Sequence, residues 1–212
     1  MMNKDINSAL RDALVLIAIT LVSGLLLGLV NMLTEEPIRA QKEAAVTESC
    51  KAVFPAEEGF AQVSSFELTG YVPTEMLSAD LAKEGVTVGN IYNAVGADGS
   101  VVGYAIEVTS AEGYGGDIKL MCGITAEGIL RGVSILEISE TAGLGMRAGD
   151  VLVPQIHNLD AGHLTFTKTG KTSPDEIDAI SGATITTTAF VNCVNAALDV
   201  SDEIIPAEGG AA

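Results

Sequence analysis

Residues 104–136 read YAIEVTSAEGYGGDIKLMCGITAEGILRGVSIL, and their pattern determines the fold class. Apolar side chains alternate with mostly polar or small ones in three short runs, over 104–109, 118–124 and 129–135. Glycine-containing segments at 113–116 and 126–128 separate the runs. A period of two is typical of β-strands, and short glycine turns favour antiparallel neighbours. The stretch therefore predicts an antiparallel meander.

Helical patterns flank this meander, so the sequence predicts an α+β fold. Phe190, Val194, Ala197 and Leu198 share one face at helical spacing after residue 184. Residues 35–53 have a helix-forming composition, with Pro37 near the expected helix start. A further strand is expected over 164–168, where apolar and threonine side chains alternate. Residues 54–86 show no sustained period, and we expect a loop with short helical or strand pieces there.

Residues 13–33 read ALVLIAITLVSGLLLGLVNML and contain no charged side chain. A helix of this length is roughly 31 Å long, which matches the hydrocarbon core of a bilayer. A cleaved signal peptide would have a shorter apolar region that ends in a small-residue cleavage site, and a buried core helix would show a polar face. The sequence therefore predicts five parts: an N-terminal cytoplasmic tail (1–12), a transmembrane helix (13–33), a helical linker (34–53), one globular domain (54–201) and a flexible acidic tail (202–212).

The orientation of the span depends on few charges. Lys4 and Arg11 precede it, and Arg39 and Lys42 follow it. The positive-inside rule counts these residues, and their numbers are equal on the two sides. The α-amino group and the proximity of Arg11 favour a cytoplasmic N-terminus, which would place the globular domain outside the cytoplasm.

The charge composition excludes one class of partner. The formal net charge is −17, and nucleic-acid binding requires clustered basic side chains. The three cysteines match no metal-binding spacing, and their odd number leaves at least one thiol free. Cys122 and Cys193 are expected to be buried, although the sequence also allows a disulfide. His157 and His163 are isolated, so we expect neither a metal site nor a catalytic residue.

Residues 178–184 read DAISGAT and come directly before the predicted C-terminal helix. This arrangement places the hydroxyl of Thr184 at a helix N-terminus, where free N–H groups and the positive end of the helix dipole suit a phosphate. Ser181, Gly182 and Ala183 add little bulk around that hydroxyl. The alternative is a polar turn in which Ser181 or Thr184 is a simple N-cap.

The same stretch resembles the flavinylation motif of the FMN-binding domain family, Asp-x-x-(Ser/Thr)-Gly-Ala-Thr. In that family the last threonine carries FMN through a phosphoester bond. Residues 140–145 (ETAGLG) resemble the family's Glu-Thr-x-Gly-Leu-Gly loop, which lines the isoalloxazine pocket, and residues 113–119 match its strand-turn-strand segment. The resemblance implies covalent FMN on Thr184 and these further cofactor-binding residues: Asp178, Ser181, Gly182, Ala183, Glu140, Thr141, Leu144, Gly145, Lys168 and Thr187.

Taken over nearly its whole length, the chain resembles the G subunits of Rnf-type electron-transport complexes. The resemblance implies a component of the inner or plasma membrane that relays electrons between ferredoxin and NAD, coupled to Na⁺ or H⁺ movement. It also implies the other subunits of the complex as partners, a Mg²⁺-dependent flavin transferase that attaches FMN from FAD, and no catalysis by this chain alone. The alternatives are the C subunit of a sodium-translocating NADH:quinone reductase, an anchored binding module without a redox group, and a stand-alone reductase.

Overall fold

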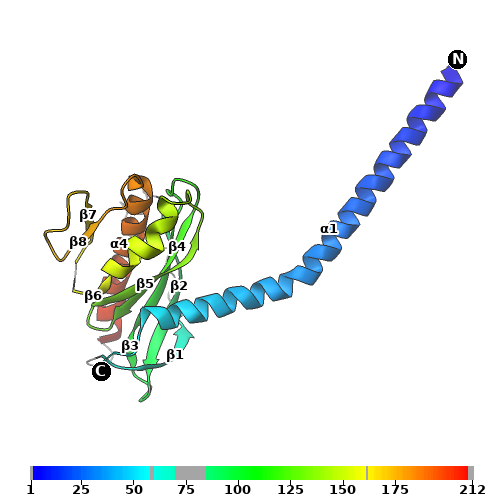
Figure 1. The fold of residues 1–212 in the computed structure, drawn as a ribbon. Helices are drawn as coiled ribbons and strands as arrows, with labels where there is room; N and C mark the ends of the chain where they lie inside the picture. Colours follow the sequence, from blue (N-terminus) through cyan, green and yellow to red (C-terminus); the bar gives the residue numbers. More distant parts are fainter. Residues whose placement is uncertain (1, 58–59, 70–84, 161, 210–212) are drawn as a thin grey trace. The chain divides into compact units, whose positions relative to one another are not determined.

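The computed structural model describes residues 2–57, 60–69, 85–160 and 162–209 (Figure 1). The chain divides into two compact units, residues 1–44 and residues 45–212. Part of the segment expected to be a loop, residues 70–84, lies outside the described residues. The last three residues of the predicted tail lie outside them as well.

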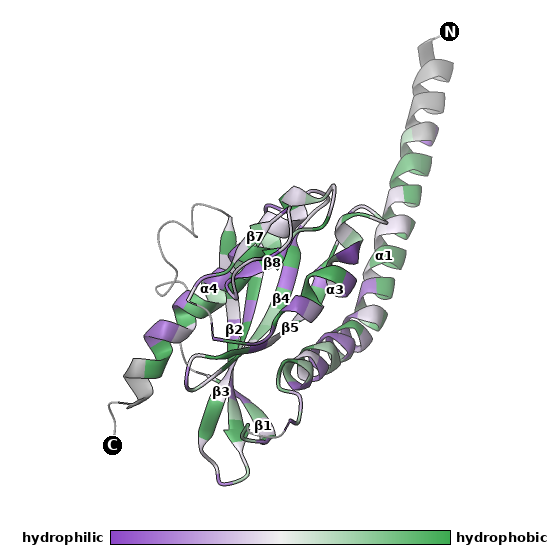
Figure 2. Cartoon of the chain, turned by 60° about the vertical axis from the view of Figure 1, so that its left-hand side comes forward, coloured by the Kyte–Doolittle hydropathy of each residue, from purple (hydrophilic) through white to green (hydrophobic). Residues whose placement is uncertain are grey.

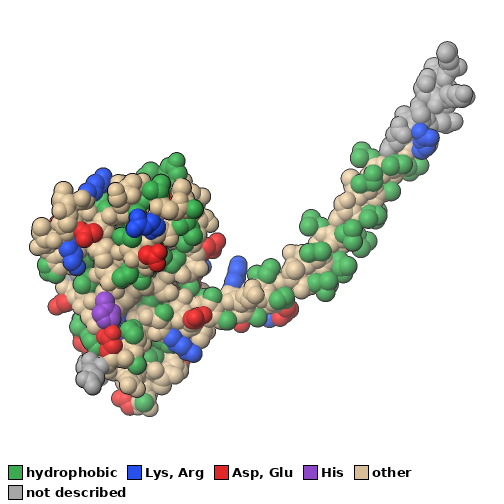
Figure 3. All heavy atoms as spheres, viewed as in Figure 1, with side chains coloured by type: hydrophobic (Ala, Val, Ile, Leu, Met, Phe, Trp, Pro, Cys, Tyr) green, Lys and Arg blue, Asp and Glu red, His purple; other side chains and the backbone are tan. Residues whose placement is uncertain are grey.

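The first helix, α1 (Met2–Val53), contains the predicted span and the predicted helical linker in one element. The side chains of residues 13–33 are exposed in the chain by itself, and hydrophobic ones surround the helix (Figure 2, Figure 3). By length and composition this helix could cross a membrane. Pro37 lies inside α1, whereas the sequence predicts a new helix that begins near it. The flanking Glu, Ala, Gln and Lys residues favour helix strongly enough for the chain to remain helical across the proline.

Six antiparallel strands form the main sheet, and their spatial order follows their order in the sequence. The strands are β1 (Val63–Leu68), β2 (Val86–Gly96), β3 (Val101–Ser110), β4 (Ile118–Thr125), β5 (Leu130–Ile138) and β6 (His157–Leu159). The pairs β3–β4 and β4–β5 confirm the predicted meander, and β2 extends it by pairing with β3. Strand β1 is one of the short strand pieces expected within residues 54–86, and Val86, the first residue of β2, is the last residue of that segment.

Both faces of the central strands are covered. Helix α4 (Thr184–Gly209) contacts β3 and β4, and its predicted apolar face, from Phe190 to Leu198, is buried in the main core. Ala105 and Met121 belong to a second buried cluster, with Cys50 and Val53 from the end of α1. Successive side chains of a strand point to opposite faces, so this cluster lies on the face away from α4. Burial on both faces explains why β3 is almost fully buried rather than alternating.

Helix α4 continues through the start of the predicted flexible tail. Val200 and Ile204 are fully buried, and their spacing of four residues extends the apolar face of the helix. Each such burial contributes about 1.5–3 kcal/mol relative to exposure, which favours helix over a frayed end. The prediction of a flexible tail from residue 202 is therefore wrong for the residues up to Ile204.

A smaller sheet lies between the main sheet and α4 in the sequence. Its strands, β7 (Thr165–Thr167) and β8 (Glu176–Asp178), pair in parallel. β7 confirms the expected strand near 164–168 in a shorter form. Three short helical segments lead from β5 to β6: η2 (Gly145–Arg147), α3 (Ala148–Val151) and η3 (Val153–Gln155).

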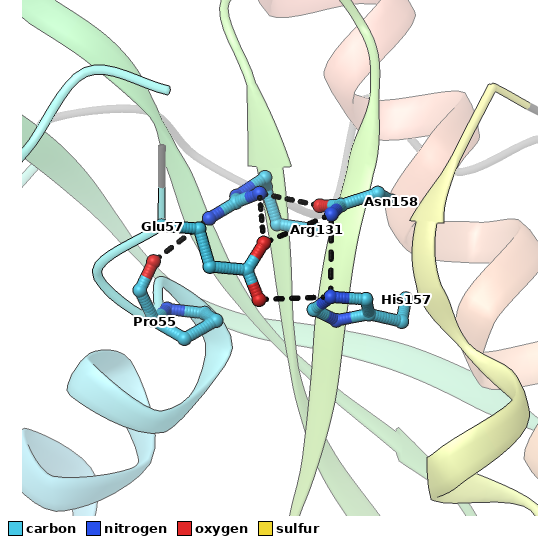
Figure 4. A network of polar contacts seen from close by, with 5 residues as sticks. All are labelled: Pro55, Glu57, Arg131, His157 and Asn158. Carbon is cyan, nitrogen blue, oxygen red and sulfur yellow. Dashed lines mark hydrogen bonds and ion pairs between the residues drawn. The ribbon is translucent and has the colours of Figure 1, made fainter. Parts of the chain in front are cut away.

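One buried arginine connects the segment after α1 to the edge of the main sheet (Figure 4). Arg131 on β5 is 2% exposed, and its guanidinium donates to the carbonyl of Pro55 at 2.8 Å and to the side chain of Asn158. The same group lies 3.4 Å from Glu57 Oε2 and 3.6 Å from the centre of the Phe60 ring. These contacts satisfy a buried charge that would otherwise be costly.

Candidate functional site

A cavity of about 450 Å³ opens where two loops meet the N-terminus of α4. The start of α4 and the turn before it contribute five lining residues, Gly182, Ala183, Thr184, Ile185 and Thr186. The loop after β5 contributes Glu140, Thr141, Leu144 and Gly145, and the loop between β3 and β4 contributes Tyr114. The cavity is of a size that takes a small organic cofactor.

The turn that leads into α4 is shaped by two side chains behind the cavity. The amide of Gln155 accepts a hydrogen bond from Asp178 N at 2.7 Å and donates one to Asp178 O at 3.0 Å. Gln155 thus pairs with the backbone of β8 as a neighbouring strand would. Thr187 Oγ1 accepts from Ile180 N at 3.2 Å and donates to Ala183 O at 2.9 Å. The segment before Thr184 is therefore braced at both ends.

Gly182 supplies the reversal inside this turn. Its φ is +81°, a left-handed conformation that side-chain-bearing residues rarely adopt. The Ala183 N to Ile180 O bond of 3.0 Å closes the turn, and a side chain on Gly182 would also approach Leu144 at 3.3 Å. The glycine of the DAISGAT stretch is thus required by backbone geometry and by the neighbouring loop.

The loop at 140–145 packs directly against α4. A Cβ added at Gly145 would lie 2.7 Å from Thr186 Oγ1 and 2.8 Å from Glu140 Oε2, so only glycine fits there. Glu140 Oε1 accepts a hydrogen bond from Tyr114 N at 2.8 Å, which attaches this loop to the β3–β4 connection. One carboxylate oxygen of Glu140 therefore has a structural partner, and the other lies beside Gly145.

The first turn of α4 offers polar groups to the cavity. The first backbone bond within the helix runs from Thr187 N to Ala183 O at 3.1 Å, so the N–H groups of residues 184–186 precede the helical ladder. These groups and the helix dipole favour an anion at this end. The hydroxyls of Thr184 and Thr186 make no hydrogen bond to another described residue, whereas those of Thr187 and Thr188 bond to backbone carbonyls.

Most of the residues implied by the family resemblance lie together, and the rest divide into two groups. Seven of them line the cavity: Glu140, Thr141, Leu144, Gly145, Gly182, Ala183 and Thr184. Asp178 and Thr187 lie behind it, in the bracing contacts of the turn. Ser181 and Lys168 are exposed and do not belong to the lining.

Three lining residues were not among the predicted site residues: Tyr114, Ile185 and Thr186. Tyr114 lies in the glycine-rich segment 113–119, whose resemblance to a strand-turn-strand connection marks no single residue as a pocket residue. Ile185 and Thr186 belong to a run, ITTT, whose inward and outward positions depend on how α4 lies against the loop at 140–145. An apolar residue at a helix start was the one signal that could have pointed to Ile185.

Comparison with known proteins identifies the family. The FMN-binding domain model matches residues 113–199, and the RnfG N-terminal region model matches residues 1–53. The G subunit of an ion-translocating oxidoreductase complex from Pseudomonas aeruginosa is 31% identical over 92% of this chain and 89% of its own. The chain belongs to the G-subunit family of ion-translocating oxidoreductase complexes.

Other members of this family match over similar lengths. The G subunit of the Na⁺-translocating ferredoxin:NAD⁺ oxidoreductase complex of Acetobacterium woodii is 29% identical over 88% of each chain. Among solved structures, NqrC of Shewanella oneidensis superposes with a TM-score of 0.57 at 12% identity, over 82% of this chain and all of that one. This likeness confirms the predicted fold, an apolar helix followed by an antiparallel sheet domain with helices. The family membership and the FMN-binding domain make the chain a flavoprotein of the electron-transfer class.

Proposed function

We propose that this chain is a membrane-anchored electron-transfer subunit that carries FMN in a phosphoester bond to Thr184. The observation that supports it most directly is the free hydroxyl of Thr184 at the N-terminus of α4, inside a cavity lined by the family's loop residues. Bound FMN would supply one- and two-electron redox chemistry, so a single flavoprotein could connect a one-electron carrier to a two-electron carrier.

The residues present fit this group. The N–H groups of the first turn of α4 and the helix dipole favour a phosphate beside Thr184. Leu144 and Ile185 give the cavity apolar walls, which suit a flat aromatic ring. Glu140 Oε2 offers an acceptor, and Thr186 offers a hydroxyl. Exposed Ser181 and Gly182 leave the approach to Thr184 uncovered.

The attachment needs a second enzyme. In the proposed step, Thr184 Oγ1 attacks the FMN phosphorus of FAD, the P–O–P bond breaks, AMP leaves, and the threonine proton passes to a base of a Mg²⁺-dependent flavin transferase. Nothing in the proposed role requires an acid or base of this chain during electron transfer.

We further propose that the partners are the other subunits of a ferredoxin:NAD⁺-type complex, since a relative that matches over most of its length bears that name. The orientation proposed for the span places residues 34–212 outside the cytoplasm. It is supported by Arg11, which lies closer to the span than Arg39 and Lys42 do on the other side.

The attachment is tested by mass spectrometry of the full-length chain produced together with a flavin transferase. We expect the wild type to gain the mass of FMN less one water, on the peptide that contains Thr184. Thr184→Ala should lose this mass and the visible flavin absorbance while its far-ultraviolet circular dichroism stays unchanged.

The matched control is Thr188→Ala, one turn further along α4, where the hydroxyl is exposed and bonds only to Thr184 O at 2.9 Å. This variant should keep the flavin. A wild-type peptide at its unmodified mass, made alongside an active transferase, would refute the proposed function.

A further inference from the structure

Thr186 combines burial with an unused hydroxyl. Its side chain is 1% exposed and lines the cavity, yet its Oγ1 has no hydrogen-bond partner among the described residues. Thr187 and Thr188, which follow it on α4, both donate to the carbonyl four residues earlier. Water in the cavity can reach this Oγ1, since among the described residues the fully buried side-chain atoms without a partner are Thr69 Oγ1 and Asn93 Oδ1. A hydroxyl that only water solvates is available to a ligand that enters the cavity.

The surroundings of Thr186 define what that ligand group can be. The hydroxyl lies beside Gly145, and Glu140 Oε2 lies beside the same glycine. A phosphate placed here would meet the Glu140 carboxylate, and two negative groups repel each other. A flavin ring is neutral when oxidised and carries carbonyl oxygens and ring nitrogens that accept hydrogen bonds. The position therefore favours the ring over the phosphate.

We propose that Thr186 positions the isoalloxazine ring by donating its hydroxyl hydrogen to an oxygen or nitrogen acceptor on the ring. This inference rests on the proposed function. It divides the first turn of α4 into two roles: Thr184 carries the phosphate at the cavity mouth, and Thr186 orients the ring against the loop at 140–145. A donor at the ring stabilises the reduced form, which holds more negative charge. Thr186 thereby raises the midpoint potential of the bound flavin.

The test compares three full-length variants, each produced with the flavin transferase and purified in detergent. Thr186→Val keeps the shape of the side chain and removes the hydroxyl. Thr186→Ser keeps the hydroxyl and removes the methyl group. Thr188→Val removes a hydroxyl of the same helix that does not line the cavity. The readouts are flavin content by mass, absorption spectrum, midpoint potential of the loaded fraction and melting temperature of the flavin-free chain.

We expect Thr186→Val to carry flavin. The equilibrium between its oxidised and reduced flavin should shift roughly tenfold toward the oxidised form, which lowers the midpoint potential by about 30 mV for a two-electron couple. Thr186→Ser should restore the potential, and Thr188→Val should not change it. The flavin-free Thr186→Val chain should melt at about the wild-type temperature, because the hydroxyl bonds to no described residue and valine keeps the shape of the side chain.

Two results would overturn the role of Thr186. One is a loaded Thr186→Val protein with wild-type spectrum and potential. The other is a flavin-free Thr186→Val chain that melts well below the wild type, which would show a purely structural hydroxyl. Both differ from failure of the proposed function, in which the wild type itself carries no flavin.

Discussion

Glu57 lies in the segment after α1 and contacts three side chains at the sheet edge, Asn158, Arg131 and His157. Its Oε2 accepts from Asn158 at 3.0 Å and lies near Arg131, and its Oε1 lies 2.9 Å from His157 Nε2. The hydrogen bond from Asn158, together with the charges of His157 and Arg131, lowers the pKa of Glu57 below its usual 4.5. The folded state therefore stabilises the ionised form of the Glu57 carboxylate relative to the protonated form.

The sign of the pH effect follows from this lowered pKa. The contribution of Glu57 to the free energy of unfolding is fully present above pH 4.5, the usual pKa of the carboxyl group. It is lost as the pH falls through the lower pKa that this group has in the folded state. We expect the melting temperature of the wild type to fall more steeply below pH 4.5 than that of Glu57→Gln, which has no charge to lose. Thermal denaturation at stepped pH measures the difference. Equal slopes for the two proteins would contradict the role assigned to Glu57.

At the scale of elements, the cavity lies where the loop at 140–145 approaches the start of α4 closely at Gly145. Neither element could form the cavity alone, since the loop supplies Glu140 and Leu144 and the helix supplies Thr184 and Thr186. The closeness of the two at Gly145 fixes which face of α4 points inward.

Gly145→Ala should force the loop away from α4. The added Cβ would lie 2.7 Å from Thr186 Oγ1, so one of the two elements must move. We expect a loss of about 1–3 kcal/mol in the free energy of unfolding, typical of overpacking, and a lower flavin content after production with the transferase.

The control for this change is Gly149→Ala in α3, where the nearest atom to an added Cβ is 3.9 Å away. Its free energy of unfolding should equal that of the wild type or exceed it by up to about 1 kcal/mol, because alanine favours helix more than glycine does. Urea denaturation and flavin absorbance report both effects. If the two variants had the same free energy of unfolding and the same flavin absorbance, the close contact at Gly145 would not be needed for stability or for flavin attachment.

For the whole molecule, the proposed orientation places residues 45–212 outside the cytoplasm, and thiol labelling tests it. The native thiols should react little with a thiol-labelling reagent. Cys50, Cys122 and Cys193 are free and buried, which confirms the expectation for Cys122 and Cys193. Burial raises the pKa of Cys50 to about 11 and that of Cys193 to about 12, and the thiolate is the reactive form.

A cysteine introduced at an exposed site should therefore dominate labelling by a membrane-impermeant thiol reagent. We expect Glu127→Cys, in the exposed β4–β5 turn, to react in intact cells if residues 34–212 lie outside the cytoplasm. A cysteine at position 3, before the span, should react only after lysis. The reverse pattern would overturn the proposed orientation, and labelled peptides identified by mass spectrometry provide the measurement.

The local patterns predict the fold correctly where the apolar residues of the pattern are buried in the core. Tyr104, Ile106 and Val108 alternate in sequence and enter the α4-facing core, and Phe190 and Val194 do so from the helix. The sequence was least informative where tertiary contacts decide. Strand β1 is one of the short strand pieces expected within residues 54–86, and its exposed, weakly patterned sequence pairs with the edge of β2. The expected flexible tail is wrong at Ile204, because burial of this side chain in the core favours helix at the end of α4.

The candidate site shows the same division. The DAISGAT stretch and the residues 140–145 were recognisable as motifs, and the structure brings them to one cavity. The threonine run at 186–188 was not interpretable, because three identical side chains differ only in direction. Thr187 turns back to brace the preceding turn, Thr188 faces solvent, and Thr186 lines the cavity.

By itself, the sequence of this protein determined the apolar span, the antiparallel meander, the C-terminal helix and the threonine at its start, because hydrophobic periodicity and small-residue turns act between near neighbours. Only the tertiary structure decided which hydroxyls line the cavity, which glycine allows the loop to reach α4, and which partners surround the buried Arg131. Those outcomes depend on contacts between segments that lie far apart in the sequence. The steric fit of such segments cannot be predicted from the periodicity of either one.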